Sequence, residues 1–103
     1  MATNLEYIKY VCDQITLDVD ITYKKMFGEY IIYLNAKPVI LVCDNTIFLK
    51  IKEEINDIMK DASKDYPYEG AKLHYTIDPN DSMFNEVLDI LEKLTPIPKK
   101  RKR

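Results

Sequence analysis

The sequence predicts an α+β fold in which an antiparallel β-meander sheet is covered by helices on one face. Two amphipathic helical patterns lie near the two ends of the 103-residue chain. Between them, apolar runs of strand length are separated only by short polar breaks, and such short links require antiparallel pairing. The expected order is one helix, three or four strands, a second helix, another strand and a last helix, or α-β(3-4)-α-β-α.

The first helix is predicted from apolar residues at helical spacing, which form a single stripe: Leu5, Ile8, Val11, Cys12 and Ile15. Thr3 and Glu6 have the T-x-x-E spacing of a capping box, in which each side chain satisfies a free backbone N–H of the first turn. β-branched and aromatic residues replace helix formers after Leu17, so we expect the first strand to begin near Ile21.

The central strands are expected at Glu29–Leu34, Val39–Cys43 and Thr46–Ile51. Asp44 and Asn45 tolerate the left-handed backbone conformation, which predicts a two-residue hairpin turn between the last two of them. Pro38 has no N–H to donate to a neighbouring strand, so it should begin its strand or lie on an edge.

The second half of the chain is expected to add two helices and a strand. The face of a short middle helix is formed by Ile51, Ile55, Ile58 and Met59. Leu73, Tyr75 and Ile77 alternate with polar residues, as in a half-buried strand. The apolar face of the last helix consists of Met83, Phe84, Val87, Leu88, Ile90, Leu91 and Leu94. Asp81 or Ser82 is the expected N-cap.

Charge is distributed unevenly along the chain. The net charge of −2 is the balance of 15 basic and 17 acidic residues, but five of the basic ones are the last five residues, Lys99, Lys100, Arg101, Lys102 and Arg103. The rest of the chain therefore has a net charge of −7. Pro96 and Pro98 precede this run, so we expect a folded domain over residues 1–95 and a flexible basic tail over residues 96–103.

The basic tail suits three different roles. Five cations neutralise about five phosphates and release counterions, which gives weak nucleic-acid binding without sequence specificity. The run also resembles a nuclear localisation signal, or it is a solvated tail without a partner. The acidic body opposes nucleic-acid binding by any other part of the chain.

No catalytic, cofactor-binding or metal-binding residues are predicted. The common hydrolase, metalloprotease and nucleotide-binding motifs are absent, and Cys12 and Cys43 lack metal-finger spacing. His74 is the single histidine, and an enzyme would need it beside a cysteine or a carboxylate. The chain shows neither a secretory signal nor a membrane span, so we expect a cytoplasmic protein. Eight tyrosines suit a core margin or a partner surface, and the pair flanking Pro67 is expected to be exposed.

The segment from Tyr23 to Ile51, YKKMFGEYIIYLNAKPVILVCDNTIFLKI, resembles the N-terminal domain of the TfoX (Sxy) family of bacterial competence regulators. The later YPYEGAK and the Lys-rich end resemble small stand-alone members of that family. The matching motif residues are Lys25, Met26, Phe27, Gly28, Tyr30, Lys37, Pro38, Asp44 and Lys50. This sequence departs from the family pattern at Asn35-Ala36, where relatives often have a glycine. The resemblance covers only the N-terminal domain of the full-length regulators.

The resemblance implies an antiparallel α+β domain similar to the secretion-chaperone-like fold, often an isologous dimer, with the motif residues acting as fold determinants. It implies no catalysis. We therefore expect a non-enzymatic binding or regulatory module that forms a homodimer and acts through contacts with a protein partner. The alternative is weak, sequence-independent nucleic-acid binding through residues 99–103.

Overall fold

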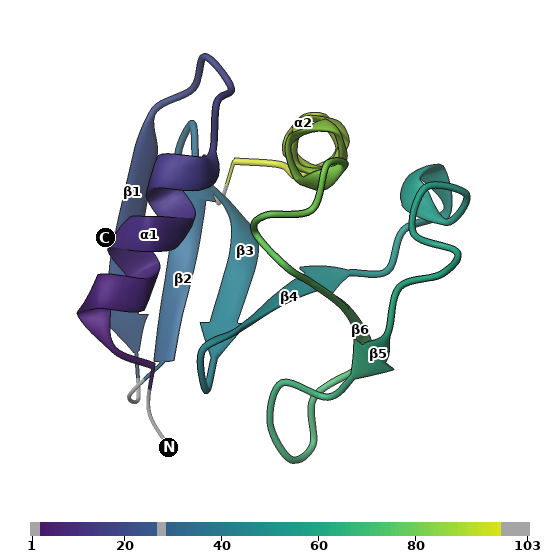
Figure 1. Cartoon of the computed structure of the whole chain (residues 1–103), viewed down its shortest axis with the longest axis horizontal. Coiled ribbons are helices and arrows are strands. Elements are labelled where there is room, and N and C mark those ends of the chain that lie inside the picture. Colours follow the sequence, from purple (N-terminus) through teal and green to yellow (C-terminus); the bar gives the residue numbers. More distant parts are fainter. Residues whose placement is uncertain (1–2, 27–28, 98–103) are drawn as a thin grey trace, which may run out of the picture.

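The computed structural model describes residues 3–26 and 29–97, which form an α+β fold. Within these residues, a six-stranded antiparallel sheet is combined with two α-helices (Figure 1). The elements follow the chain as α1 (Leu5–Gln14), β1 (Ile21–Met26), β2 (Glu29–Leu34), β3 (Lys37–Cys43), β4 (Thr46–Lys50), the 3₁₀ helix η1 (Glu53–Ile55), β5 (Lys64–Asp65), β6 (His74–Ile77) and α2 (Phe84–Leu94). The strand order in the sheet is β1-β2-β3-β4-β6-β5.

Two tight turns create the meander of β2, β3 and β4. Asn35 and Ala36 have φ angles of 52° and 67°, and Asp44 and Asn45 have φ angles of 53° and 55°. Two successive residues with positive φ make the type I′ hairpin turn, whose twist matches that of paired strands. The prediction of a two-residue turn at Asp44-Asn45 is therefore confirmed, and the first hairpin uses the same turn type with an alanine in place of glycine.

Pro38 is the second residue of β3, an interior strand of the sheet. The pairing of Leu41 with Phe48 sets the register between β3 and β4, and it places Pro38 beyond Lys50, the last residue of β4. On its other side, the β2–β3 register shifts between Ile32 and Tyr33, next to the pair formed by Tyr33 and Pro38. The missing N–H of Pro38 thus falls beyond the β4 ladder and beside a bulge.

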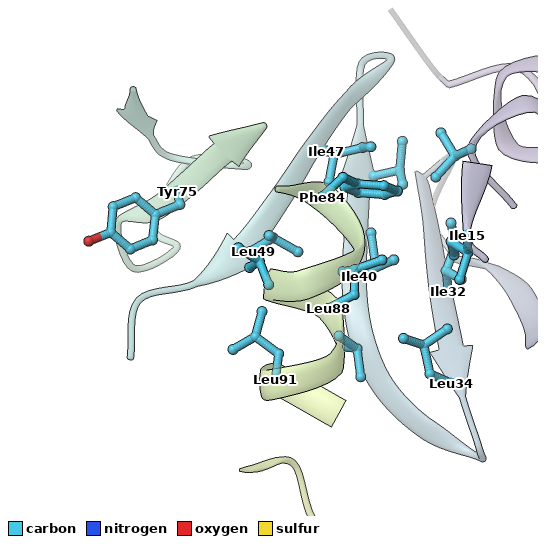
Figure 2. Close-up of a cluster of buried hydrophobic side chains, with 14 of the residues drawn as sticks. Ile15, Ile32, Leu34, Ile40, Ile47, Leu49, Tyr75, Phe84, Leu88 and Leu91 are labelled. Carbon is cyan, nitrogen blue, oxygen red and sulfur yellow. The ribbon is translucent and has the colours of Figure 1, made fainter. Parts of the chain in front are cut away.

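Both α-helices contribute to one hydrophobic core on one face of the sheet. Ile8 and Val11 of α1 are fully buried, as are Phe84 and Leu88 of α2. Figure 2 shows Phe84, Leu88 and Leu91 of α2 beside Ile40, Ile47 and Leu49 of the central strands. The predicted apolar faces of the first and last helices are therefore confirmed except at their outer ends, where Leu5 and Leu94 are 40% and 36% exposed. The core leaves the opposite face of β2, β3 and β4 outside the helical layer.

The middle α-helix predicted from Ile51 to Met59 was wrong. The structure has only η1 there, followed by a turn in which the Met59 N–H donates to the Ile55 carbonyl at 2.9 Å. This single turn buries Ile55 and Met59, whereas Ile51 stays 36% exposed. A short segment gains little from further helical turns once its two core residues are buried. Strand β5 was not predicted, because its two exposed residues carry no apolar alternation.

The predicted helix caps also need correction. The N-cap of α1 is Asn4, whose side-chain oxygen accepts from the Tyr7 N–H at 2.8 Å. Thr3 is not part of a capping box, because its hydroxyl donates to the Glu29 carboxylate at 3.0 Å. The N-cap residue of α2 is Met83, which makes no side-chain capping bond, and Asp81 accepts from the Met83 N–H at 3.1 Å. Asp81 therefore stabilises the turn before α2 and not its first helical turn.

Candidate protein-binding groove

The sheet face opposite the helices carries a groove of about 1200 Å³. Its floor is a row of side chains that runs across three strands, because Ile31 of β2 pairs with Leu41 of β3, which pairs with Phe48 of β4. Ile31 and Leu41 are half-buried, and Phe48 is buried. We call this concavity the sheet groove.

One wall of the sheet groove is formed by the segment before β6. Tyr68, Ala71 and Leu73 of this segment line the groove, together with Ile51 at the end of β4. Tyr68 is 60% exposed and Leu73 is 38% exposed. Large apolar side chains that line a concavity and remain this accessible are typical of a surface that binds a partner.

Opposite charges lie at the two ends of the sheet groove. Lys50, Lys52 and Lys72 line one end, and all three are exposed. Glu29 lines the other end, where its carboxylate accepts from the Thr3 hydroxyl and from the Asp44 N–H, each at 3.0 Å. These two hydrogen bonds hold the Glu29 side chain against Thr3 and the β3–β4 turn. The groove is therefore apolar along its floor, basic at one end and acidic at the other.

His74 lies at the basic end of the sheet groove and has structural contacts. Its Nδ1 atom is 2.7 Å from the Lys72 carbonyl oxygen, so Nδ1 carries the proton and donates to that oxygen. The imidazole ring meets the Phe48 ring edge-on, with centroids 6.4 Å apart. The interpretation of His74 as a hydrogen-bonded strand residue is consistent with these contacts.

Cys43 also lines the sheet groove but does not adjoin His74. Cys43 pairs with Thr46 on β4, and His74 pairs with Lys50, four residues further along β4. His74 on β6 is therefore two strands across from Cys43 and four residues along. Strand spacing and rise place the two residues about 16 Å apart, too far to share a proton. Burial, Glu29 and Asp44 raise the pKa of the Cys43 thiol to about 11, so it is protonated at neutral pH.

Cys12 is half-buried on α1, and its pKa is also raised, by burial and by Asp13. A thiol with a raised pKa has little thiolate and is a poor nucleophile. Neither cysteine therefore resembles an activated nucleophile. Among residues 3–26 and 29–97, no group of three or more His, Cys, Asp or Glu side chains has the arrangement of a metal site. No helix in the described part of the chain is long and apolar enough to cross a membrane.

Besides Asp44 in the β3–β4 turn and Lys50 at the basic end of the sheet groove, four motif residues have clear positions in the structure. Met26 and Pro38 line the sheet groove, and Tyr30 is buried with its ring edge-on to Tyr23 at 6.0 Å between centroids. Lys37 joins the β2–β3 turn to α2, because its Nζ lies 2.9 Å from the Glu92 carboxylate and donates to the Glu92 carbonyl at 3.0 Å.

The remaining motif residues are less informative. Lys25 is exposed on edge strand β1. Phe27 and Gly28 fall outside the described residues, and so do all five residues of the basic run, Lys99 to Arg103. The expected exposure of the tyrosines beside Pro67 is confirmed, since Tyr66 is 58% exposed.

A second, more polar cleft of about 740 Å³ lies between α1, the end of β6 and the residues after η1. Tyr7 and Tyr10 line it, and the Tyr10 hydroxyl donates to Asn80 Oδ1 at 2.5 Å. Burial, followed by Asp78 and Tyr10, raises the pKa of Tyr7. The Tyr10 hydroxyl and the Asn80 amide oxygen of this cleft are thus engaged with each other, and we take the more apolar sheet groove as the candidate functional site.

The sheet groove was not predicted from the sequence, although one signal pointed to it. The runs YIIYL, VILVC and TIFL are apolar at nearly every position, whereas a strand covered on one face alternates apolar and polar residues. Such continuous runs indicate that both faces of a strand are covered or lie in a contact surface.

Comparison with known proteins identifies one informative relative. The chain is similar to an uncharacterised 12.7 kDa protein in the trpE 5′ region of Spirochaeta aurantia. The two sequences are 31% identical over 105 aligned positions, which cover 99% of this chain and 91% of the relative. No family model matches the chain. No solved structure matches it either.

Proposed function

We propose that this chain, which belongs to the same family as the 12.7 kDa protein of Spirochaeta aurantia, is a non-enzymatic protein-binding module. In this proposal it is a small cytoplasmic regulator that resembles the TfoX N-terminal domain and acts as a homodimer. The single observation that carries the proposal is the sheet groove. It combines an apolar floor of Ile31, Leu41 and Phe48 with accessible rim residues.

The groove supports protein binding better than small-molecule chemistry. Its floor is one face of three strands, and its apolar side chains are not interleaved with convergent polar groups of the kind that orient a substrate. Tyr68 and Leu73 on the wall of the groove extend its apolar surface outward. Accessible aromatic and apolar side chains of this kind are typical of residues that become buried in a protein interface.

The TfoX likeness supports the proposal through the motif positions. Met26 and Pro38 line the groove, and Lys37 attaches α2 to the hairpin that carries Pro38. Tyr30 and Lys50 also line the groove, so five of the matched residues shape the groove or the hairpin beside it. We propose that the motif determines this binding surface as well as the fold.

Size-exclusion chromatography coupled to light scattering tests the proposal. We expect the full chain to have the mass of a dimer at micromolar concentration and the Leu41→Glu variant to have that of a monomer. A carboxylate at the centre of the groove floor would lose its hydration in any interface formed there, and this cost in free energy opposes dimer formation. Leu5→Glu is the matched control, because Leu5 is 40% exposed on α1, away from the groove.

Circular dichroism must show that both variants keep the fold of the wild-type chain. Ile31→Glu is a second groove variant with the same expected result. The proposal is contradicted if the wild-type chain is a monomer, or if Leu5→Glu converts the dimer to a monomer as fully as Leu41→Glu does. The regulatory part is tested by transcript profiling after gene deletion, where unchanged transcripts in every growth condition argue against it.

A second candidate function rests on the five consecutive basic residues from Lys99 to Arg103. In this alternative, the full chain binds duplex DNA weakly. A plot of the logarithm of the binding constant against the logarithm of the salt concentration then has a slope of about −4.5. A chain that ends at Pro98 should then lose the binding, because the rest of the chain has a net charge of −7. Equal binding by both chains rules out this alternative.

A further inference from the structure

We infer that the sheet groove binds the groove of a second copy of this chain face to face, with the Glu29-to-Lys50 diagonals of the two copies running in opposite directions, so that Lys50 of each copy meets Glu29 of the other. This inference rests on the proposed homodimer and adds the face, the orientation and the charge contacts. The evidence is the placement of charge around the groove, which makes the surface complementary to itself only in one orientation.

The two charges lie at diagonally opposite corners of the groove floor. Glu29 begins β2, and its neighbour Tyr30 pairs with Val42, which places Glu29 level with Cys43. Cys43 pairs with Thr46 on the next strand, and Lys50 lies four residues further along that strand. Strand spacing and rise separate Glu29 from Lys50 by about 16 Å.

Leu41 lies at the midpoint of this diagonal, in the middle of the apolar floor. A two-fold axis through Leu41, in the plane of the interface and perpendicular to the diagonal, exchanges the two corners. Each Lys50 then faces a Glu29, and Leu41 packs against its counterpart. An isologous interface needs this kind of self-complementary patch.

The alternative two-fold axis, along the diagonal, places Lys50 on Lys50 and Glu29 on Glu29. Like charges that meet across an interface oppose association. Lys52 and Lys72 add positive charge at the Lys50 end and strengthen this discrimination. An acidic peptide would satisfy only the basic end of the groove, whereas a second copy satisfies both ends.

Charge variants with sedimentation equilibrium test the arrangement. Lys50→Glu should raise the dimer dissociation constant by about tenfold, because two attractive contacts become repulsive. Glu29→Gln keeps a side-chain oxygen that accepts from Thr3 and Asp44, so it removes the charge while preserving those bonds. In this dimer, adding Glu29→Gln to Lys50→Glu should restore about half of the change in the logarithm of the dissociation constant, because the repulsion between the two carboxylates disappears while the original attraction stays lost.

Lys24→Glu is the matched control. Lys24 pairs with Ile31 on edge strand β1 and is exposed, and it does not line the groove. It undergoes the same charge change on the same sheet face and should leave the dissociation constant unchanged. The inference is overturned if Lys50→Glu weakens association no more than Lys24→Glu, or if Glu29→Gln does not restore affinity. In those two cases the wild-type chain still forms a dimer, whereas a monomeric wild-type chain overturns the proposed homodimer itself.

Discussion

Replacing Ala36 by glycine should stabilise this protein, although glycine usually destabilises an ordered chain. Ala36 has a φ of 67° in the β2–β3 turn. The left-handed conformation costs an L-amino acid with a Cβ about 1 to 2 kcal/mol, and glycine removes that cost. Glycine also gives the unfolded chain more freedom, which lowers stability by about 0.4 to 1 kcal/mol. The expected net gain in the free energy of unfolding is about 0.5 to 1 kcal/mol.

Urea unfolding followed by circular dichroism measures this gain, with all variants at the same protein concentration because self-association adds to apparent stability. Ala62→Gly is the matched control. Ala62 is not among the described residues with positive φ, and it packs against the core, so its replacement should lower stability by about 1 kcal/mol. Equal destabilisation by the two substitutions would refute the assignment of a left-handed turn at Ala36.

Three further predictions follow from contacts and pKa shifts. Lys37→Met should lower the free energy of unfolding by about 2 kcal/mol, because it removes two hydrogen bonds to Glu92, one to the carboxylate and one to the carbonyl. The Lys37 hydrogen bond lowers the pKa of Glu92, so the stability that it contributes is complete above about pH 4.3 and is lost as the pH falls through the lowered value. Urea unfolding at pH 7 and pH 3 should therefore show a smaller effect of Lys37→Met at pH 3, and an equal effect at both pH values contradicts this reasoning. Iodoacetamide at pH 7.5 should alkylate Cys12 before Cys43, whose pKa of about 11 makes its thiolate roughly 100-fold rarer than that of a thiol with the reference value of 9.0. Mass spectrometry of timed samples would contradict this if Cys43 were modified first.

Local patterns made much of the fold predictable from the sequence. The helical stripes of α1 and α2 pointed to side chains that are fully buried, such as Ile8 and Leu88. Asp44-Asn45 predicted its turn because both residues tolerate positive φ. In each case the residues that carry the signal are close together in the sequence, so neighbouring side chains and backbone preference decide the local structure.

Other features depended on contacts between distant residues. Thr3 leaves the expected capping box because Glu29, 26 residues away, accepts its hydroxyl hydrogen bond. Lys37 donates a hydrogen bond to Glu92, which is 55 residues away in the sequence, and no local pattern predicts this contact. The middle helix failed for a related reason: Ile55 and Met59 reach the core with a single turn, and Ile51 is left at the groove.

The sheet groove was the least predictable feature, because the chain segment that forms its wall has no regular pattern. Continuous apolar runs in β2 to β4 indicate two occupied faces, but they do not show that Tyr68 and Leu73 line the same groove as Phe48. The charge pattern at its ends likewise depends on register, since Glu29 and Lys50 become corners of one surface only after three strands pair.

An NMR dilution series tests most directly whether the sheet groove is the binding surface. The amide and methyl signals of the full chain would be recorded from millimolar to low micromolar concentration. We expect concentration-dependent shifts for Ile31, Leu41 and Leu73 in the groove, and constant signals for Leu5 and Leu94, which are exposed on the two helices. Shifts confined to the helices, or no shifts for a chain that scatters light as a monomer, would contradict a binding role for the groove.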